Sequence, residues 1–434
     1  MRYEFDEYTL LTSERLLRRR GERVALKPKV FDTLLALVRN HGRLLGKEEL
    51  IGLIWPDSFV EAGNLSQNIF TLRRVLGESP HDHRFIVTVP GYGYRFVAKV
   101  REIGEGEGPR PRQKTPKDID VYQTYVKGRF FWDKRTEEGL RVGLSSARAV
   151  LEAEPELPLG YVGLADSYLL MGEYLYLPPG ESFPLALEAA RKALALDPTL
   201  GEAHASLAEY AFFYGRDWAG AERHYRDAIK LSPDYASARH WYTWFLIAMS
   251  RYEDAAEQIR QAQIIDPGSL ILNTIVGLPH FYVGRYERAI RQFRRTLEVE
   301  PGYQNARYYL GSALVHAGRH EEAISEFETM VAAWPIQQAI ALLGYCYAVS
   351  GRRDEASRML SRLDELERQR FVAAYVRAFI HVGLNERTLA LDQLERAYDE
   401  QEPWVVFLNV DPFFRGLRGE PRFMRLLGRL RFPG

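Results

Sequence analysis

Prolines recur at a nearly constant interval along the middle of this chain. They close the segments Leu196-Asp197-Pro198, Leu231-Ser232-Pro233, Ile265-Asp266-Pro267, Val299-Glu300-Pro301 and Ala333-Trp334-Pro335, with spacings of 35, 34, 34 and 34 residues. An alanine stands twelve residues before each proline (Ala186, Ala221, Ala255, Ala289 and Ala323). A larger side chain follows four residues after four of them (Tyr225, Ile259, Phe293 and Phe327). A fixed period of this length predicts stacked helical hairpins rather than one compact core.

The middle of each period carries a second signal. Gly-Arg pairs stand at Gly215-Arg216, Gly284-Arg285, Gly318-Arg319 and Gly351-Arg352. Glycine at such a point is typical of a helix that ends in a left-handed residue. The segment resembles the tetratricopeptide (TPR) family over residues 121–402, in about eight units. The unit at 156–198 carries an insertion around residues 177–180, and residues 403–434 are expected to form a capping segment.

Residues 1–100 are organised differently. Short strands are expected at Tyr3–Leu11, Leu16–Arg18 and Arg23–Leu26, then helices at Pro28–Asn40, Lys47–Trp55 and Asn64–Gly77, and a hairpin at residues 85–97. Asn64 and Gln67 form a capping-box pattern. Phe31, Leu34, Leu35 and Val38 point inward from the first helix; Leu65, Ile69, Leu72 and Leu76 share one face of the third.

This order resembles the OmpR/PhoB-type winged-helix domain, above all in Leu72-Arg73-Arg74 and in the turn from Thr88 to Arg95. The resemblance implies that the third helix enters the major groove of double-stranded DNA and that the loop at 56–63 contacts RNA polymerase. The candidate DNA-binding residues are Gln67, Asn68, Phe70, Thr71, Arg73, Arg74, Thr88, Tyr92 and Arg95. Pro90 and Tyr92 stand where relatives often carry a basic residue, so Tyr92 is expected to contact sugar or phosphate in its place.

Charge supports this division. Residues 1–100 hold 16 Lys and Arg against 12 Asp and Glu, a net +4, which leaves −4 for the other 334 residues. This modest excess favours binding as a homodimer to tandem half-sites. Residues 101–120, rich in glycine, proline and charge, are expected to be a linker.

Other classes of protein find little support in the sequence. The N-terminus lacks the apolar run of a signal peptide, and the longest apolar candidate, residues 270–284, is too short to span a membrane. His316 and His320 are separated by the helix-breaking Gly318, and no phosphate loop, His-Glu-x-x-His or Gly-x-Ser-x-Gly motif occurs. We therefore expect no enzyme and no catalytic, cofactor or metal site. Because no receiver domain precedes residue 1 in this sequence, control by phosphorelay is not expected.

The resulting prediction is a mainly α chain: a small α+β winged helix-turn-helix domain followed by an α-solenoid of TPR-type hairpins. The expected function is that of a cytoplasmic bacterial transcriptional regulator whose TPR module binds an effector, or a protein or peptide partner in its groove, or mediates self-association. Aromatic residues on the first helices make the groove a candidate binding surface (Tyr161, Tyr168, Tyr210, Tyr214, Trp241, Tyr242, Trp244, Tyr282 and Tyr308), although core packing accounts for most of them. Two alternatives stay open: a scaffold whose winged helix does not bind DNA, and a sensor whose repeats bind a metabolite.

Overall fold

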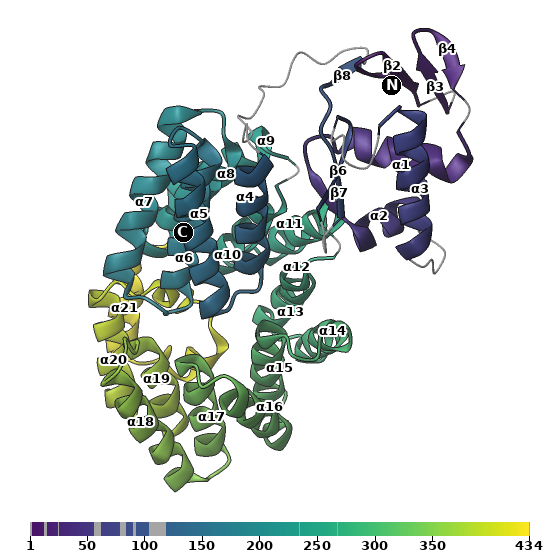
Figure 1. Cartoon of the computed structure of the whole chain (residues 1–434). Helices are drawn as coiled ribbons and strands as arrows, with labels where there is room; N and C mark the ends of the chain where they lie inside the picture. The colour runs from purple at the N-terminus through teal and green to yellow at the C-terminus, as the bar shows by residue number, and fades with distance from the viewer. Residues whose placement is uncertain are drawn as a thin grey trace. The chain divides into compact units, whose positions relative to one another are not determined.

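The chain forms two compact units in the computed structural model, Met1–Pro111 and Arg112–Gly434 (Figure 1). The structure describes residues 2–12, 15–24, 26–55, 62–78, 84–89, 93–103, 119–233, 235–266 and 268–433. Each unit has a hydrophobic core of its own, and the two cores share no residue. Among the helices described in either unit, none is long and apolar enough to cross a membrane.

The N-terminal unit combines two small antiparallel sheets with three helices. One sheet has the strand order β4-β3-β2-β1-β8 and the other the order β5-β7-β6. The strands are β1 (Arg2–Phe5), β2 (Tyr8–Leu11), β3 (Leu16–Arg19), β4 (Glu22–Val24), β5 (Leu44–Gly46), β6 (Ile86–Val89), β7 (Gly93–Phe96) and β8 (Val100–Ile103). The helices are α1 (Pro28–Arg39), α2 (Lys47–Ile54) and α3 (Ala62–Val75).

Aromatic rings join the two sheets of this unit. Phe5 of β1 packs edge-on against Phe96 of β7, with ring centroids 5.0 Å apart, and stacks on Tyr8 of β2. The expected inward face of α1 is buried at Phe31, Leu34 and Val38, whereas Leu35 is only half-buried.

The structure corrects several boundaries. The expected strand Tyr3–Leu11 is a hairpin, because Asp6 adopts a φ of 50° and turns the chain so that Phe5 pairs with Tyr8. Strands β5 and β8 were not predicted, and β8 extends to residue 103, inside the expected linker, where it pairs with β1. Because α3 begins at Ala62, Asn64 lies inside its first turn, and the predicted cap at Asn64 was wrong.

The second unit is an α-solenoid of paired helices. Over residues 119–399 the described helices form eight successive pairs. They are α4 (Ile119–Asp133), α5 (Glu137–Ala153), α6 (Pro158–Glu173), α7 (Pro179–Leu196), α8 (Gly201–Tyr210) continued by the π-helix η1 (Ala211–Gly215), α9 (Trp218–Leu231), α10 (Ala236–Ala248), α11 (Tyr252–Ile265), α12 (Leu270–Ile275) with α13 (Leu278–Tyr282), α14 (Tyr286–Val299), α15 (Gln304–His316), α16 (His320–Ala333), α17 (Gln337–Val349), α18 (Arg353–Glu367), α19 (Ala374–Gly383) and α20 (Arg387–Asp399).

The periodic positions have the roles that their spacing predicts. All five repeat alanines and the four larger residues that follow them are buried, each at most 2% exposed. Gly284, Gly318 and Gly351 adopt φ values of 76–81°, as expected at a left-handed helix end. At the first of these turns Arg216, with φ 52°, takes that conformation in place of Gly215, because the π-helix η1 extends the preceding helix through the glycine.

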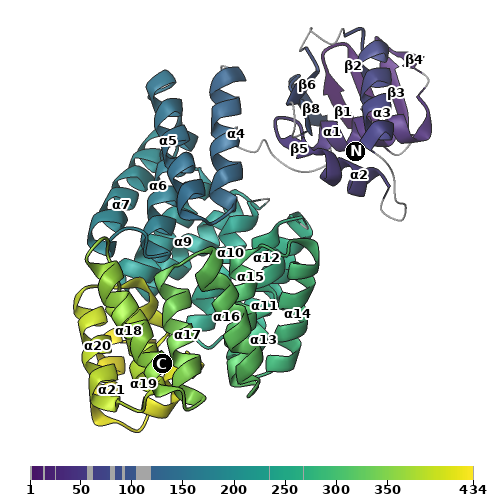
Figure 2. The same cartoon turned by 60° about the horizontal axis from the view of Figure 1, so that its bottom comes forward.

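The last residues do more than cap the array. Two 3₁₀ segments, η2 (Pro403–Phe407) and η3 (Pro412–Leu417), precede the short helix α21 (Pro421–Leu430). The Trp218 indole of α9 donates hydrogen bonds to the carbonyls of Leu430 and Arg431, at 3.1 and 3.0 Å. The C-terminal helices, yellow in Figure 2, therefore contact the third repeat as well as the last.

The array also closes on itself between its second and seventh repeats. Gln337 and Gln338, at the start of α17, donate hydrogen bonds to the carbonyls of Leu175 and Tyr174, at 3.0 and 2.8 Å. An ion pair of 2.9 Å joins Arg370 to Glu137 beside them. The inner face of the repeats is therefore enclosed.

Candidate nucleic-acid interface

Helix α3 buries one face and presents the other to solvent. Leu65, Ile69, Leu72 and Leu76 are at most 2% exposed. On the opposite face Gln67 and Arg74 are exposed, Thr71 is half-buried, and the Phe70 ring is 57% exposed. The two faces are those that helical spacing predicts.

Two predicted contact residues have partners within the domain. Asn68 donates hydrogen bonds to the carbonyl of Lys29 and the hydroxyl of Thr33, at 3.2 and 2.9 Å, and so anchors α3 to α1. Thr71 donates to the carbonyl of Gln67 at 2.8 Å, which leaves its methyl group on the helix surface.

Arg73 ties α3 to the hairpin. Its guanidinium donates to the carbonyl of Ile86 and the hydroxyl of Thr88, both at 2.9 Å. Glu78, just beyond the helix, is buried and accepts from the backbone amides of Phe85 and Ile86 at 3.0 and 3.1 Å. These contacts fix the orientation of the hairpin relative to α3.

The other hairpin residues differ in their surroundings. Arg95 lies on β7, between β5 and β6, and is only 9% exposed. Tyr92 lies outside the described residues, as does most of the 56–63 loop expected to contact RNA polymerase. The structure thus brings Gln67, Phe70, Thr71 and Arg74 together on an open face and engages Asn68, Arg73 and Thr88 in the contacts that support it.

The inner face of the repeat array is covered by the chain itself. Phe407 packs within 6.2 Å, ring to ring, of Phe212, Phe213, Trp244 and Tyr282. Farther along, Phe413 packs against residues of repeats six to eight (His316, Tyr345 and Phe379). Residues 403–414 therefore occupy the groove in which a partner peptide was expected. Their aromatic rings pack against the aromatic side chains of the inner helices.

Buried carboxyl groups hold this segment in place. Glu402 accepts hydrogen bonds from the backbone amides of Ala374 and Tyr375 at the start of α19, and burial raises its pKa to about 7. Asp411 accepts from the Tyr375 hydroxyl at 2.8 Å, and burial raises its pKa to about 6. Both acids act as hydrogen-bond acceptors for this contact.

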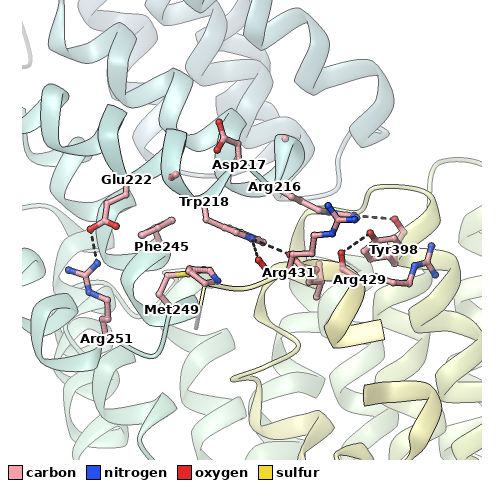
Figure 3. A pocket seen from close by; sticks show the side chains of 14 residues that line it. Arg216, Asp217, Trp218, Glu222, Phe245, Met249, Arg251, Tyr398, Arg429 and Arg431 are labelled. Carbon is pink, nitrogen blue, oxygen red and sulfur yellow. Dashed lines mark hydrogen bonds and ion pairs between the residues drawn. The ribbon is translucent and has the colours of Figure 1, made fainter. Parts of the chain in front are cut away.

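An open cleft lies where the C-terminal tail crosses α9 (Figure 3). Arg216 donates to the carbonyl of Tyr398 at 3.1 Å and stacks on its ring. Arg251 pairs with Glu222 at 2.6 Å. These two arginines hold elements of the array together.

Among the described residues, one group of potential metal ligands was not predicted from the sequence, since no metal site was expected. His204 of α8 with His224 and Asp227 of α9 bring three ligand atoms within 4.8 Å of one another. The two imidazole Nδ1 atoms are 3.0 Å apart and share a hydrogen bond. His224 and Asp227 lie 20 and 23 positions after His204, so only the pairing of the two helices reveals the group.

A winged helix with one exposed face on α3 and an α-solenoid of TPR-type hairpins together define the class of this protein. Residues 21–96 match the family described as the C-terminal part of transcriptional regulatory proteins. Residues 210–269, 277–336 and 314–378 match tetratricopeptide repeats. The chain therefore carries an OmpR/PhoB-type winged-helix domain followed by TPR repeats.

Curated relatives match the N-terminal part. The transcriptional regulator HilA of Salmonella typhi is 35% identical over 114 residues, which cover 26% of this chain and 20% of HilA. The transcriptional activator CadC of Escherichia coli is 30% identical over 114 residues, 26% of this chain and 22% of CadC. The chain thus matches about a fifth of the length of each relative. The structure of a monomeric IFIT1 mutant has a TM-score of 0.51 at 18% identity, covers 71% of each chain, and shows a likeness of fold alone.

Proposed function

We propose that this protein is a sequence-specific DNA-binding regulator of transcription whose repeat array receives an effector or a partner. The observation that carries the proposal is the open face of α3, where Gln67, Phe70, Thr71 and Arg74 lie together beside a hairpin. Arginine and glutamine recognise guanine and adenine edges through paired hydrogen bonds, and apolar groups contact thymine methyls. A helix that served only protein contacts would not need this combination of side chains.

The supporting residues keep this face in position. Because Arg73 and Asn68 are engaged within the domain, we assign them to positioning α3 against the hairpin and α1. Arg74 is the cation of α3 that remains exposed for a base or a phosphate. With a net charge of only +4 over residues 1–100, we expect a dimer on tandem half-sites.

The enclosed array favours a small effector over an extended peptide. Residues 403–414 already occupy the inner face, so a peptide in the groove would first have to displace their aromatic side chains. Partner proteins, including RNA polymerase at the 56–63 loop, would bind outer surfaces. A regulator of this kind, without enzymatic activity, would act in the cytoplasm, where bacterial DNA lies.

Selection of duplexes from a random pool tests this proposal. The intact chain should enrich a repeated half-site, and binding should weaken steeply with salt. Arg74→Ala should lower affinity for the selected site about ten- to a hundred-fold, because one bidentate base contact contributes that much discrimination. Arg23→Ala, an exposed arginine on edge strand β4, is the matched control and should leave affinity unchanged.

The other outcomes separate the hypotheses. Enrichment by residues 1–104 but not by the intact chain would indicate that the repeats mask the DNA-binding face. If neither protein enriches a sequence, the regulator is rejected in favour of a scaffold.

A further inference from the structure

A cavity lies inside the repeat array, between the inner helices and the C-terminal segment. It is lined by twelve aromatic residues of the described array, among them Trp241, Trp244, Tyr309 and Trp404. The space open to the centre of a water molecule measures about 90 Å³. Because a single water needs roughly 10–15 Å³ of such space, the cavity has room for a small organic molecule.

Three residues of the lining carry buried nitrogen atoms without a hydrogen-bond partner among the described residues. They are Nε of Arg135, Nε1 of Trp241 and both ring nitrogens of His240. The residues are 2%, 1% and 4% exposed. A buried polar atom without a partner costs free energy, so this lining is incomplete as it stands.

The missing partners have a definite chemistry. Arginine Nε and tryptophan Nε1 can only donate, and a neutral histidine offers one donor and one acceptor. Burial and the charge of Arg135 lower the pKa of His240, which keeps its imidazole neutral. Three of the four open positions are therefore donors, so an occupant rich in acceptor oxygens would complete them.

Arg135 supplies a positive charge beside these hydrogen-bond donors. The Arg135 guanidinium lies 3.7 Å from the ring centroid of Trp132, and its one ion pair among the described residues is to Asp133, at 3.9 Å. Two acids also line the cavity, Glu173 and Asp411. Burial raises the pKa of Glu173 to about 7 against the opposing effect of Arg135, so Glu173 is only partly ionised near neutral pH. Asp411, whose pKa is raised to about 6, is ionised there but accepts hydrogen bonds from the Tyr375 hydroxyl and the Phe413 amide and forms no described ion pair with Arg135. The positive charge of Arg135 is thus incompletely balanced.

We propose that this cavity binds a small aromatic carboxylic acid, with the carboxylate at Arg135, Trp241 and His240 and the flat ring among the aromatic side chains. The acid would be the effector of the regulator, and this role, though not the binding itself, rests on the proposed function. The Trp404 and Phe413 side chains also line the site, so the C-terminal segment closes it.

Titration calorimetry on the intact chain tests the site without any DNA. The probes are benzoate and phenylacetate, with benzamide and phenylacetamide as neutral counterparts and benzylamine as the cation. We expect the acids to bind at least tenfold more tightly than the amides and the amine not to bind. Indole fluorescence should change with the acids, because Trp241 and Trp244 lie in the lining.

Variants locate the site. Arg135→Met should abolish the preference for acid over amide, whereas Arg141→Ala, an exposed arginine of α5, should not affect it. If Arg135→Met fails to fold, His240→Phe is the second variant. Because it removes two unpartnered nitrogens, it should raise the melting temperature, and the affinity for the acids should fall at least tenfold. Equal binding of acids and amides would overturn the proposal and indicate a site for neutral aromatic molecules. No binding of any probe would also overturn it and would assign the cavity to water.

The effector role is measured separately, as DNA affinity with and without the bound acid. A change in DNA affinity supports that role, and an unchanged affinity rejects it while the site stands. If acids bind but no DNA sequence is ever enriched, the site is supported and the regulator is rejected. The failures of the two proposals are therefore distinguishable.

Discussion

Arg73 and Arg74 are neighbours in the sequence but have different surroundings. Arg73 donates two hydrogen bonds to the hairpin, to Ile86 and Thr88, whereas Arg74 is exposed. A doubly substituted protein would therefore mix a loss of stability with a loss of DNA contact. The two substitutions have to be made separately.

Arg73→Ala should lower the free energy of unfolding of the N-terminal unit by about 1–3 kcal/mol, because the buried carbonyl of Ile86 loses a charged partner. Arg74→Ala should change it by less than about 0.5 kcal/mol, as is usual for an exposed position. Urea denaturation of both variants measures the difference. Equal losses would show that Arg73 does not hold the hairpin.

Helical spacing was enough to predict which residues of α3 face outward. It could not predict the partners of Asn68 or Arg73, because Thr33 and Thr88 lie 35 and 15 residues away and approach only in the folded domain. The cavity could not be predicted for the same reason, because its unpartnered nitrogens belong to α10 and to the turn at Arg135, which are far apart in the sequence.

The buried acids predict a dependence of stability on pH. The pKa of Glu173 is raised to about 7 in the folded state, above its ordinary value of 4.5, so its contribution to stability is lost as the pH rises through 7. Glu173→Gln should therefore stabilise the array more at pH 8 than at pH 5, by up to about 3 kcal/mol. Urea midpoints at both pH values test this, with the exposed Glu181→Gln as control. An equal effect at both pH values would contradict it.

At the scale of single elements, helix pairs depend on small residues at their contacts. A Cβ added to Gly311 of α15 would lie 2.6 Å from the Phe327 ring of α16. Gly311→Ala should cost about 1–3 kcal/mol through overpacking, despite the better helix propensity of alanine. Gly180→Ala in α7 meets no atom within 4 Å and should be neutral or stabilising. Thermal denaturation of both variants measures the two effects. If Gly311→Ala leaves the stability unchanged, the Phe327 ring must move to make room for the added methyl group.

The long helices were predictable because proline and glycine mark their ends and alanine marks their contacts. Strands β5 and β8 escaped prediction because three or four residues carry too little pattern to distinguish a strand from a loop. Residues 403–417 were expected only to cap the array. Their contacts with the inner helices depend on the closed path of the whole solenoid, which no local pattern contains.

At the scale of the whole molecule, the separate cores predict two unfolding transitions. Ile69→Ala, in the N-terminal core, should shift only one transition, and Phe293→Ala, in the repeat core, only the other. Each substitution removes a large buried side chain and should cost about 2–5 kcal/mol. Calorimetry of the intact chain measures both. A shift of both transitions by either variant would show that the units unfold together.

Closure of the array between Tyr174 and Gln338 limits how such a protein can evolve. Open solenoids lengthen or shorten by duplication or loss of a repeat, because each repeat contacts only its neighbours. Here a gained or lost repeat would separate the second repeat from its distant partner and break the contacts made by residues 403–414. Descendants of this chain are therefore expected to vary in surface loops while the number of repeats stays constant.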